Sequence, residues 1–409
     1  MSTRPLLIVL LIAVSGWNMG CATPTHGEQA RIDARRRMNS VNAELTYDQA
    51  EQAFKTGQFD DALKNINACL KAMPDQPKYH LLQGRIHLET HRLEKAIKSF
   101  QSALEQQSEF ADAHYFSGIV YQRWSDDEKA HEQYRAAFEL ELSAVGYLLA
   151  AAESLVALGR VDEAKRLVEQ KLDYFEHNPA LRQLLGQIAL LQDDPETAAT
   201  YLAEASRFKP DDLLLLEEVA HAQFAAGLYV KCLDSTGELR RAIHERRPDL
   251  VHLEARCLAQ LQRFEDAREA YLQLTRLTPR DVEVWVDLGV LAWEMDDFHR
   301  MALCGARLAS LAPQRYEGYL LKGINERHHG NLREAIALLQ RAASLAPDTA
   351  LPQLVLGRVL DEAGDRDGAQ AAVRMAIQAE PENGDAKLMY VELSQDHTLV
   401  TVPSPEQAR

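Results

Sequence analysis

The chain has 409 residues, of which 46% are hydrophobic and 26% are charged, a composition typical of a globular protein with enough apolar residues for a core. Its formal net charge is −16, from 45 basic and 61 acidic residues, and a field of that sign repels phosphate backbones. We therefore expect no nucleic acid among its partners. Beyond the N-terminus, no stretch approaches the roughly 20 consecutive apolar residues that a membrane-spanning helix needs.

Residues 1–20 have the pattern of a secretory signal peptide. Arg4 precedes an apolar run, residues 6–14, which is too short to cross a bilayer but suits a signal-peptide core. The run ends in "WNMGC", where Gly20 precedes Cys21, and this resembles a bacterial lipoprotein signal, in which the cysteine becomes lipidated after cleavage. Asn18 departs from that pattern, which usually has an aliphatic residue three positions before the cysteine.

We predict cleavage before Cys21 and a lipid on its side chain, which would anchor the protein to a membrane. Ala22, in place of an aspartate, resembles the outer-membrane sorting class, so the expected location is the bacterial outer membrane, facing the periplasm. Ordinary cleavage after Ala22 and an uncleaved leader are the alternatives. Residues 22–42 follow as a spacer with a dense basic cluster, Arg31 and 35–37. We expect a solvated linker there, with contact to anionic headgroups as the alternative.

From residue 43 onward the sequence repeats itself every 34 residues. The segment from Leu81, "LLQGRIHLETHRLEKAIKSFQSAL", aligns with the segment from Leu320, "LLKGINERHHGNLREAIALLQRAA", so that glycines, alanines and apolar residues coincide. One extra residue, near Arg247, interrupts the period. The repeats begin at residues 43, 77, 111, 145, 179, 213, 248, 282, 316 and 350.

Four positions of the repeat carry the same residue types for physical reasons. Small residues at positions 8 and 20 let two helices approach closely, glycine at position 15 allows a turn between them, and proline at position 32 ends the second helix. The position-8 glycines are Gly84, Gly118, Gly186, Gly289, Gly323 and Gly357, and the position-15 glycines are Gly57, Gly159, Gly227, Gly330 and Gly364.

This pattern resembles the tetratricopeptide repeat family, whose 34-residue unit is a helix–turn–helix. The resemblance implies an all-α, right-handed superhelical solenoid of ten repeats over residues 43–383, with a capping helix at 384–395. The tail, 396–409, is expected to be disordered. The sixth repeat has Cys232 where alanine is usual and Gly237 inside its second helix, so we predict a softer joint near 236–248.

We expect no enzyme activity, no cofactor and no metal. His87 and His91 have the spacing of a metal pair but lack an obvious third ligand, so packing and turn positions are favoured. The "GDRDGA" segment, 364–369, lacks the acids of a calcium loop, and the acidic doublets at 126–127, 193–194 and 296–297 fall where a second helix starts. Cys232 and Cys257 lie on successive helices; buried thiols are favoured, with a disulfide as the alternative.

In the family that the repeat resembles, the first helix of each repeat lines the concave face, with positions 2, 5, 9 and 12 directed into the groove. The lysine and asparagine clamp of chaperone-binding members is absent here. The predicted protein-binding groove consists of apolar residues with basic neighbours: Val286, Val290, Trp293, Leu320, Ile324, His252, Arg256, Arg327 and Arg358. The alternative for the apolar side chains is packing against neighbouring helices.

These features predict a scaffold, lipid-anchored in the bacterial envelope, that recruits proteins or peptides through its concave face. Similar lipoproteins help to assemble pili, secretion channels, cell-wall machinery or polysaccharide export systems. The alternative is an exported regulator or carrier that modulates an envelope enzyme without forming a stable complex.

Overall fold

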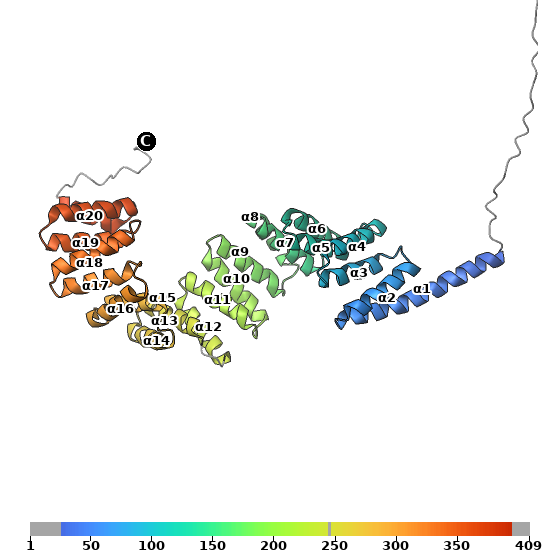
Figure 1. Ribbon diagram of the computed structural model, residues 1–409, viewed down its shortest axis with the longest axis horizontal. Helices are drawn as coiled ribbons and strands as arrows, with labels where there is room; N and C mark the ends of the chain where they lie inside the picture. Colours follow the sequence, from blue (N-terminus) through green and yellow to red (C-terminus); the bar gives the residue numbers. More distant parts are fainter. Residues whose placement is uncertain (1–25, 244–246, 395–409) are drawn as a thin grey trace, which may run out of the picture. The chain divides into compact units, whose positions relative to one another are not determined.

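Helices, without any strand, make up the part of the chain that the computed structural model describes, residues 26–243 and 247–394 (Figure 1). They are α1 (His26–Lys55), α2 (Phe59–Ala72), α3 (Pro77–Glu89), α4 (Leu93–Gln106), α5 (Ala111–Arg123), α6 (Asp127–Leu140), α7 (Val145–Ala157), α8 (Val161–Leu172), α9 (Pro179–Leu191), α10 (Pro195–Phe208), α11 (Leu213–Ala225), α12 (Tyr229–Ala242), α13 (Pro248–Gln260), α14 (Phe264–Leu277), α15 (Val282–Glu294), α16 (Phe298–Leu311), α17 (Glu317–His328), α18 (Leu332–Leu345), α19 (Ala350–Glu362), α20 (Arg366–Ala379) and α21 (Gly384–Ser394). The expected all-α fold of ten helix pairs and a final helix is confirmed.

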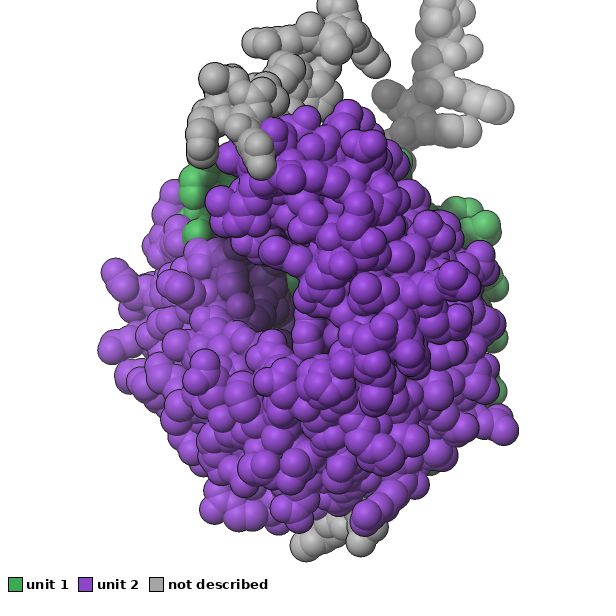
Figure 2. All heavy atoms as spheres, turned by 90° about the vertical axis from the view of Figure 1, so that its left-hand side faces the viewer, with its two compact units in different colours: residues 1–168 green, residues 169–409 purple. Residues whose placement is uncertain are grey.

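The chain divides into two compact units, Met1–Val168 and Glu169–Arg409, coloured green and purple in Figure 2. In unit 1, each helix from α1 to α6 packs against the helix that follows it, and in unit 2 the same holds from α9 to α20. Figure 1 shows this stacking clearly for α17 to α20. Each of these helices therefore buries its apolar side against its neighbours in sequence, as expected of a repeat array.

Close packing inside a repeat depends on the small residues at positions 8 and 20. A Cβ added at Gly186 would lie 2.6 Å from Leu202 Cγ, and one at Gly323 would lie 2.7 Å from Leu339 Cγ. In both repeats the large side chain at position 24 of the second helix occupies the space above the glycine. Position 20 is equally tight, since Ala198 and Ala335 are both fully buried. The steric reason given for these residues in the sequence is therefore confirmed.

Position 15 of every repeat has a left-handed backbone conformation. Five repeats have glycine there, with φ between +70° and +84°. The other five have a residue with a side chain at the same position and φ between +54° and +58°: His91, Ser125, Asp193, Gln262 and Asp296. The turn geometry thus belongs to the fold and not to glycine alone, and the non-glycine repeats adopt a conformation that disfavours a Cβ.

Replacing Gln262 with glycine should therefore raise the free energy of unfolding, by up to about 1 kcal/mol. Glutamine lacks the short polar side chain that makes this conformation tolerable for aspartate or asparagine. Denaturant unfolding would measure the gain. The reverse change, Gly227→Ala, should destabilise by a similar amount; equal stability of Gln262→Gly and the parent would contradict the strain argument.

The acidic doublets act as helix caps, as their place in the repeat indicates. Asp126, Asp194 and Asp297 each precede a second helix and accept a hydrogen bond from a backbone N–H three residues later, at 3.1 Å for Asp194 and 3.0 Å for Asp297. Such caps satisfy N–H groups that the first helical turn leaves unpaired.

His87 is buried in α3 and His91 lies in the following turn. Among the described residues, no group of three His, Cys, Asp or Glu side chains is placed to hold a metal.

The sixth repeat keeps its packing despite its unusual residues. Cys232 and Thr236 are fully buried in α12, and the Thr236 hydroxyl donates to the Leu233 carbonyl at 3.1 Å. Cys232 and Cys257 of α13 share one core cluster, and the neighbouring Cys232 thiol together with burial raises the pKa of Cys257. All four described cysteines (Cys69, Cys232, Cys257 and Cys304) are free thiols. The softer joint near 236–248 concerns motion and stays a prediction.

Most of the predicted N-terminal spacer is helical. Helix α1 begins at His26, so residues 26–42 form the first half of a 30-residue helix. Its partner α2 has 14 residues and packs on the second half. The predicted signal peptide, Cys21 and the tail at 396–409 lie outside the described residues. No described helix is long and apolar enough to span a membrane.

Candidate protein-binding surface

Helix α15 is apolar on two sides, which distinguishes it from a helix that covers a core with one face. Val284, Leu288 and Leu291 are buried in the core of unit 2. On another side, Val286 and Trp293 are half-buried and Val290 is 45% exposed. Residues 286, 290 and 293 are separated by four and three positions, so they share one face of the helix. This second apolar face is the starting point of the candidate surface.

Figure 2 shows a hollow in the surface of unit 2. Separately, two pockets of unit 2 are lined in part by predicted groove residues. One pocket, of about 380 Å³, is lined only by the first helices of the last three repeats and by the final helix: α15, α17, α19 and α21. We call it the apolar groove. Its lining residues are Trp293, Ile324, Arg327, Leu351, Leu354, Val355, Arg358, Asp385, Leu388, Met389 and Glu392.

Two leucines of the apolar groove are open to solvent. Leu388 of α21 is 61% exposed and Leu351 of α19 is 36% exposed. Ile324 and Met389 form a more buried floor, at 6% and 5%. Large apolar side chains that are exposed beside an apolar floor become buried when a partner covers them. Each Å² of apolar surface removed from water in this way contributes about 25 cal/mol of favourable free energy.

The rim of the apolar groove carries both charges. Arg327 forms an ion pair with Glu362 of the next repeat, with its Nε 2.8 Å from Glu362 Oε2. Arg358 lies 3.9 Å from Glu392 of α21, and both side chains are about half exposed. The expected basic edges are therefore partly neutralised by carboxylates one repeat further along the chain. Exposed pairs of this kind contribute little to stability, so they can exchange one partner for another.

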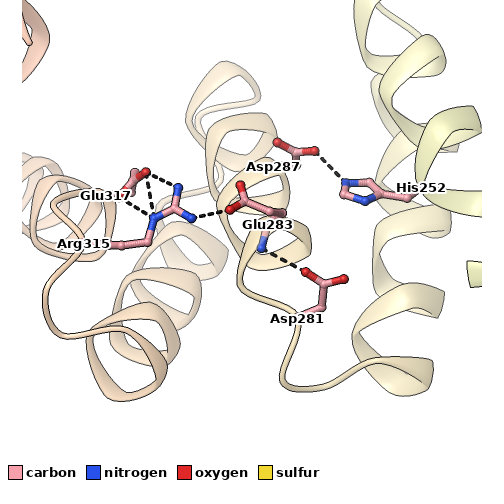
Figure 3. Close-up of polar contacts among 6 residues, drawn as sticks. All are labelled: His252, Asp281, Glu283, Asp287, Arg315 and Glu317. Carbon is pink, nitrogen blue, oxygen red and sulfur yellow. Dashed lines mark hydrogen bonds and ion pairs between the residues drawn. The ribbon is translucent and has the colours of Figure 1, made fainter. Parts of the chain in front are cut away.

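A second, more polar pocket of about 320 Å³ lies between α13, α14 and α15. Asp287 is one of its lining residues, and its carboxylate contacts three groups. The distance from its Oδ2 to His252 Nε2 is 2.7 Å, to the Tyr271 hydroxyl 3.5 Å and to Arg256 Nε 3.8 Å. Burial raises the pKa of Tyr271, so its phenol remains a neutral donor. Figure 3 shows the His252–Asp287 contact between α13 and α15.

These polar contacts join neighbouring repeats. His252 and Asp287 occupy positions 5 and 6 of successive repeats, as do Gln183 and Glu218, whose side chains are 3.2 Å apart. Arg315, just before α17, forms ion pairs with Glu283 of α15 and with Glu317 (Figure 3). The His252–Asp287 pair resembles half of a catalytic arrangement, but its recurrence at the repeat period indicates a link between helices.

The structure separates the nine predicted groove residues. Trp293, Ile324, Arg327 and Arg358 line the apolar groove, while Arg256 and Val290 line the polar pocket beside His252. Leu320 is only 4% exposed and packs in the core, as the packing alternative predicts for it, whereas Val286 is half-buried at the edge of that core and lines neither pocket.

Sequence reasoning missed five apolar residues of the groove: Leu351, Leu354, Val355, Leu388 and Met389. A signal existed, because α19 reads "ALPQLVLGRVL" and α21 reads "GDAKLMYVELS", each with more apolar residues than one buried face requires. The sequence predicts α21 as a capping helix. It does cover α20, and it also supplies one wall of the groove.

In comparisons with known protein families, this chain matches models of a single family. Two models, both described as "Tetratricopeptide repeat", match residues 47–113, 81–146 and 252–298, and residues 155–217 and 327–393, which together exceed half of the chain. The matched ranges omit residues 218–251, where the unusual sixth repeat lies. Repeats of this family are generally non-catalytic.

Among similar sequences is Cellulose synthase 2 operon protein C of Komagataeibacter xylinus, 28% identical over 265 residues, which are 58% of this chain and 19% of that protein. Superkiller complex protein 3 of Mus musculus is 38% identical over 66 residues, 16% of this chain and 4% of that protein. This chain therefore spans only a small part of the length of these relatives.

Similar solved structures include a tetratricopeptide repeat protein from Parabacteroides merdae, with a TM-score of 0.43 and 16% identity, over 58% of this chain and 93% of that one. PilF of Pseudomonas aeruginosa has a TM-score of 0.41 and 22% identity, over 51% of this chain and 94% of that one.

Proposed function

The chain belongs to the tetratricopeptide repeat family, and from this premise we propose that it is a non-catalytic scaffold that holds a partner protein in the apolar groove. One observation carries the proposal: Leu351 and Leu388 are exposed at the surface of a groove that is lined by four helices of unit 2. A protein that works alone rarely leaves such side chains grouped together in solvent.

The form of the groove favours a helical or extended peptide segment as the bound element. Trp293, Ile324 and Met389 offer an apolar floor for anchoring side chains, and tryptophan is among the residues that most often dominate binding energy. Arg358 and Glu392 on the rim can each accept an opposite charge from the partner. We therefore expect a partner segment with two or three apolar anchors and charged residues of both signs beside them.

We further propose that the scaffold is anchored by a lipid on Cys21 and works in the bacterial envelope, at the outer membrane facing the periplasm. The signal-like segment before Cys21 supports the anchor. Of the envelope systems considered, the similarity to a protein named after a cellulose synthase operon favours polysaccharide production or export over pili, secretion and the cell wall.

The alternative function is an exported regulator or carrier that acts on an envelope enzyme without stable binding. The two differ in a measurable way. A scaffold co-purifies with its partner from crosslinked and from untreated envelopes, whereas a regulator changes the rate of an enzyme that is not retained. Crosslinking through a photoreactive residue at position 388, followed by mass spectrometry, would identify the neighbouring protein in either case.

Leu388→Asp should abolish binding of the partner that the crosslinking experiment identifies, because it places a charge on the most exposed apolar side chain of the groove. The matched control is Leu303→Asp on α16, because Leu303 is exposed to a similar degree, 55% against 61%, and does not line the groove. We expect at least a tenfold loss of retained partner for Leu388→Asp and no loss for Leu303→Asp, measured by quantitative pull-down.

Trp293→Asp provides a second, more severe variant of the groove. Lost capture with unchanged helicity by circular dichroism would support binding through Trp293, whereas unfolding would assign this side chain to the core. Because Leu388 is exposed, its result remains interpretable even when Trp293→Asp unfolds. Equal retention by Leu388→Asp and Leu303→Asp would refute the groove as the binding site.

A further inference from the structure

The first half of α1 extends past its own repeat. The helix runs from His26 to Lys55, but its buried residues, Ala43, Ala50 and Ala53, all lie in its second half. Between residues 27 and 42 the described side chains are exposed, with the exception of Asp33. This segment therefore has no packing partner within the part of the chain that the structure describes.

An apolar stripe follows one side of this exposed segment. Ala34, Met38, Val41 and Leu45 are separated by four, three and four positions, which places them within an arc of about 60°. Met38 is 58% exposed, Val41 70% and Leu45 60%. Val41 and Leu45 lie two residues on either side of Ala43, so the stripe is on the side opposite to the one that α1 buries against its own repeat.

Arginines border the apolar stripe. Arg31 and Arg35 lie along one edge and Arg37 along the other, each within roughly 60° of it by helical geometry. From residue 34 to residue 43 the chain has no acidic side chain, although it has a net charge of −16 as a whole. An apolar face with flanking arginines is the composition of a helix that lies in the plane of a membrane surface. It differs from the apolar groove, where Arg327 and Arg358 are paired with carboxylates.

We propose that the apolar stripe and its arginines form a second membrane contact, which binds the surface of an anionic phospholipid bilayer. Charge complementarity identifies the occupant, because arginines attract anionic headgroups while the acidic remainder of the chain is repelled. Position also favours it: Cys21 precedes His26 by five residues, a span of at most about 18 Å. The proposal rests on the proposed lipid only for this proximity. With both contacts made, α1 holds the first repeat at the membrane surface.

The test uses the intact chain reconstituted in vesicles, with an environment-sensitive dye on a cysteine introduced at Val41. Selective labelling is feasible because the four described cysteines are at most 1% exposed, and the labelled parent chain supplies the background from Cys21. The matched control carries Ser40→Cys, which lies on the same exposed segment but about 100° outside the stripe. Vesicles contain either phosphatidylcholine alone or phosphatidylcholine with 30% phosphatidylglycerol, a composition chosen as a rough match to anionic membranes.

We expect the emission of the Val41→Cys probe to shift to the blue on anionic vesicles only, with no shift for Ser40→Cys. Adding Arg31→Glu, Arg35→Glu and Arg37→Glu should abolish the shift, because each lost arginine lowers surface binding about fivefold and three lower it about a hundredfold. The same number of reversals on exposed residues elsewhere, Arg92→Glu, Lys95→Glu and Lys98→Glu, should leave the shift intact.

Two results would overturn the membrane contact. One is an identical signal from Val41→Cys on neutral and anionic vesicles. The other is a shift that depends on protein concentration without vesicles, which would assign the stripe to a second copy of the chain. Neither result depends on Leu388, so a failure of this proposal is distinguishable from a failure of the apolar groove as a binding site.

Discussion

Gly318→Ala should lower the free energy of unfolding of unit 2 by about 1–3 kcal/mol. A Cβ at this position would lie 2.8 Å from the backbone nitrogen of Ala309 and 3.2 Å from the Gly305 carbonyl oxygen. These are backbone atoms of α16, which cannot rotate away as a flexible side chain can. Gly305 faces the same crossing from the other side, with a Cβ there 3.1 Å from the Gly318 carbonyl oxygen. The two glycines therefore set the distance between α16 and α17.

Urea unfolding and amide hydrogen exchange would measure this loss, and exchange should accelerate first in α16 and α17, because repeats respond to their neighbours. The matched control is Gly237→Ala in α12, where no atom lies within 4 Å of the added Cβ. Since glycine inside a helix is less stable than alanine, this variant should gain up to about 1 kcal/mol. A Gly318→Ala protein as stable as the parent would show that the two helices separate at little cost.

Phe100→Ala should destabilise unit 1 by about 3–5 kcal/mol, because it leaves a large cavity between α3 and α4. The Phe100 ring is fully buried and stacks on Phe116 of the next repeat, with a centroid distance of 5.9 Å. A Cβ at Gly84 would lie 2.3 Å from Phe100 Cε1, so Gly84→Ala alone should cost about 1–3 kcal/mol by forcing the ring to move. Thermal and denaturant unfolding of both variants would give these values.

The double variant isolates the contact between the two residues. In the Phe100→Ala background the ring is gone, so Gly84→Ala should be neutral or should stabilise α3 by up to about 1 kcal/mol through helix propensity. The two changes should therefore couple by about 1–3 kcal/mol. Additive losses would mean that Gly84 is required by something other than Phe100, against the idea that position 8 is small to admit the side chain at position 24.

The division of the repeat into helices could be predicted because its causes are local. Glycine or alanine at position 8, alanine at position 20 and aspartate before the second helix act within one repeat, through contacts such as Gly186 with Leu202 and the cap from Asp194. The left-handed turn at position 15 could be predicted only in the repeats that have glycine there, such as the one with Gly57. Gln262 and His91 adopt the same conformation because the fold imposes it on residues that disfavour it.

The proposed binding surface could not be predicted in the same way, because equivalent positions differ in exposure. Val286, Leu320 and Leu354 occupy position 5 of successive repeats, and Leu388 occupies the equivalent position of the final helix, yet Leu320 is 4% exposed and Leu388 is 61% exposed. What covers a first helix is the next repeat along the array, and the final helix has no further repeat beyond it among the described residues. The expected groove therefore contained Leu320, which is core, and lacked Leu388.

Sequence alone determined the number, spacing and type of the helices, because the same steric requirements apply within each 34-residue repeat. They select similar residue types at equivalent positions along the chain. The tertiary structure alone decided which apolar side chains remain open, that Arg327 and Arg358 face carboxylates one repeat further on, and that α1 continues past its packing partner. The reason is physical: exposure and charge pairing depend on neighbours that are distant in sequence, whose contacts no single repeat encodes.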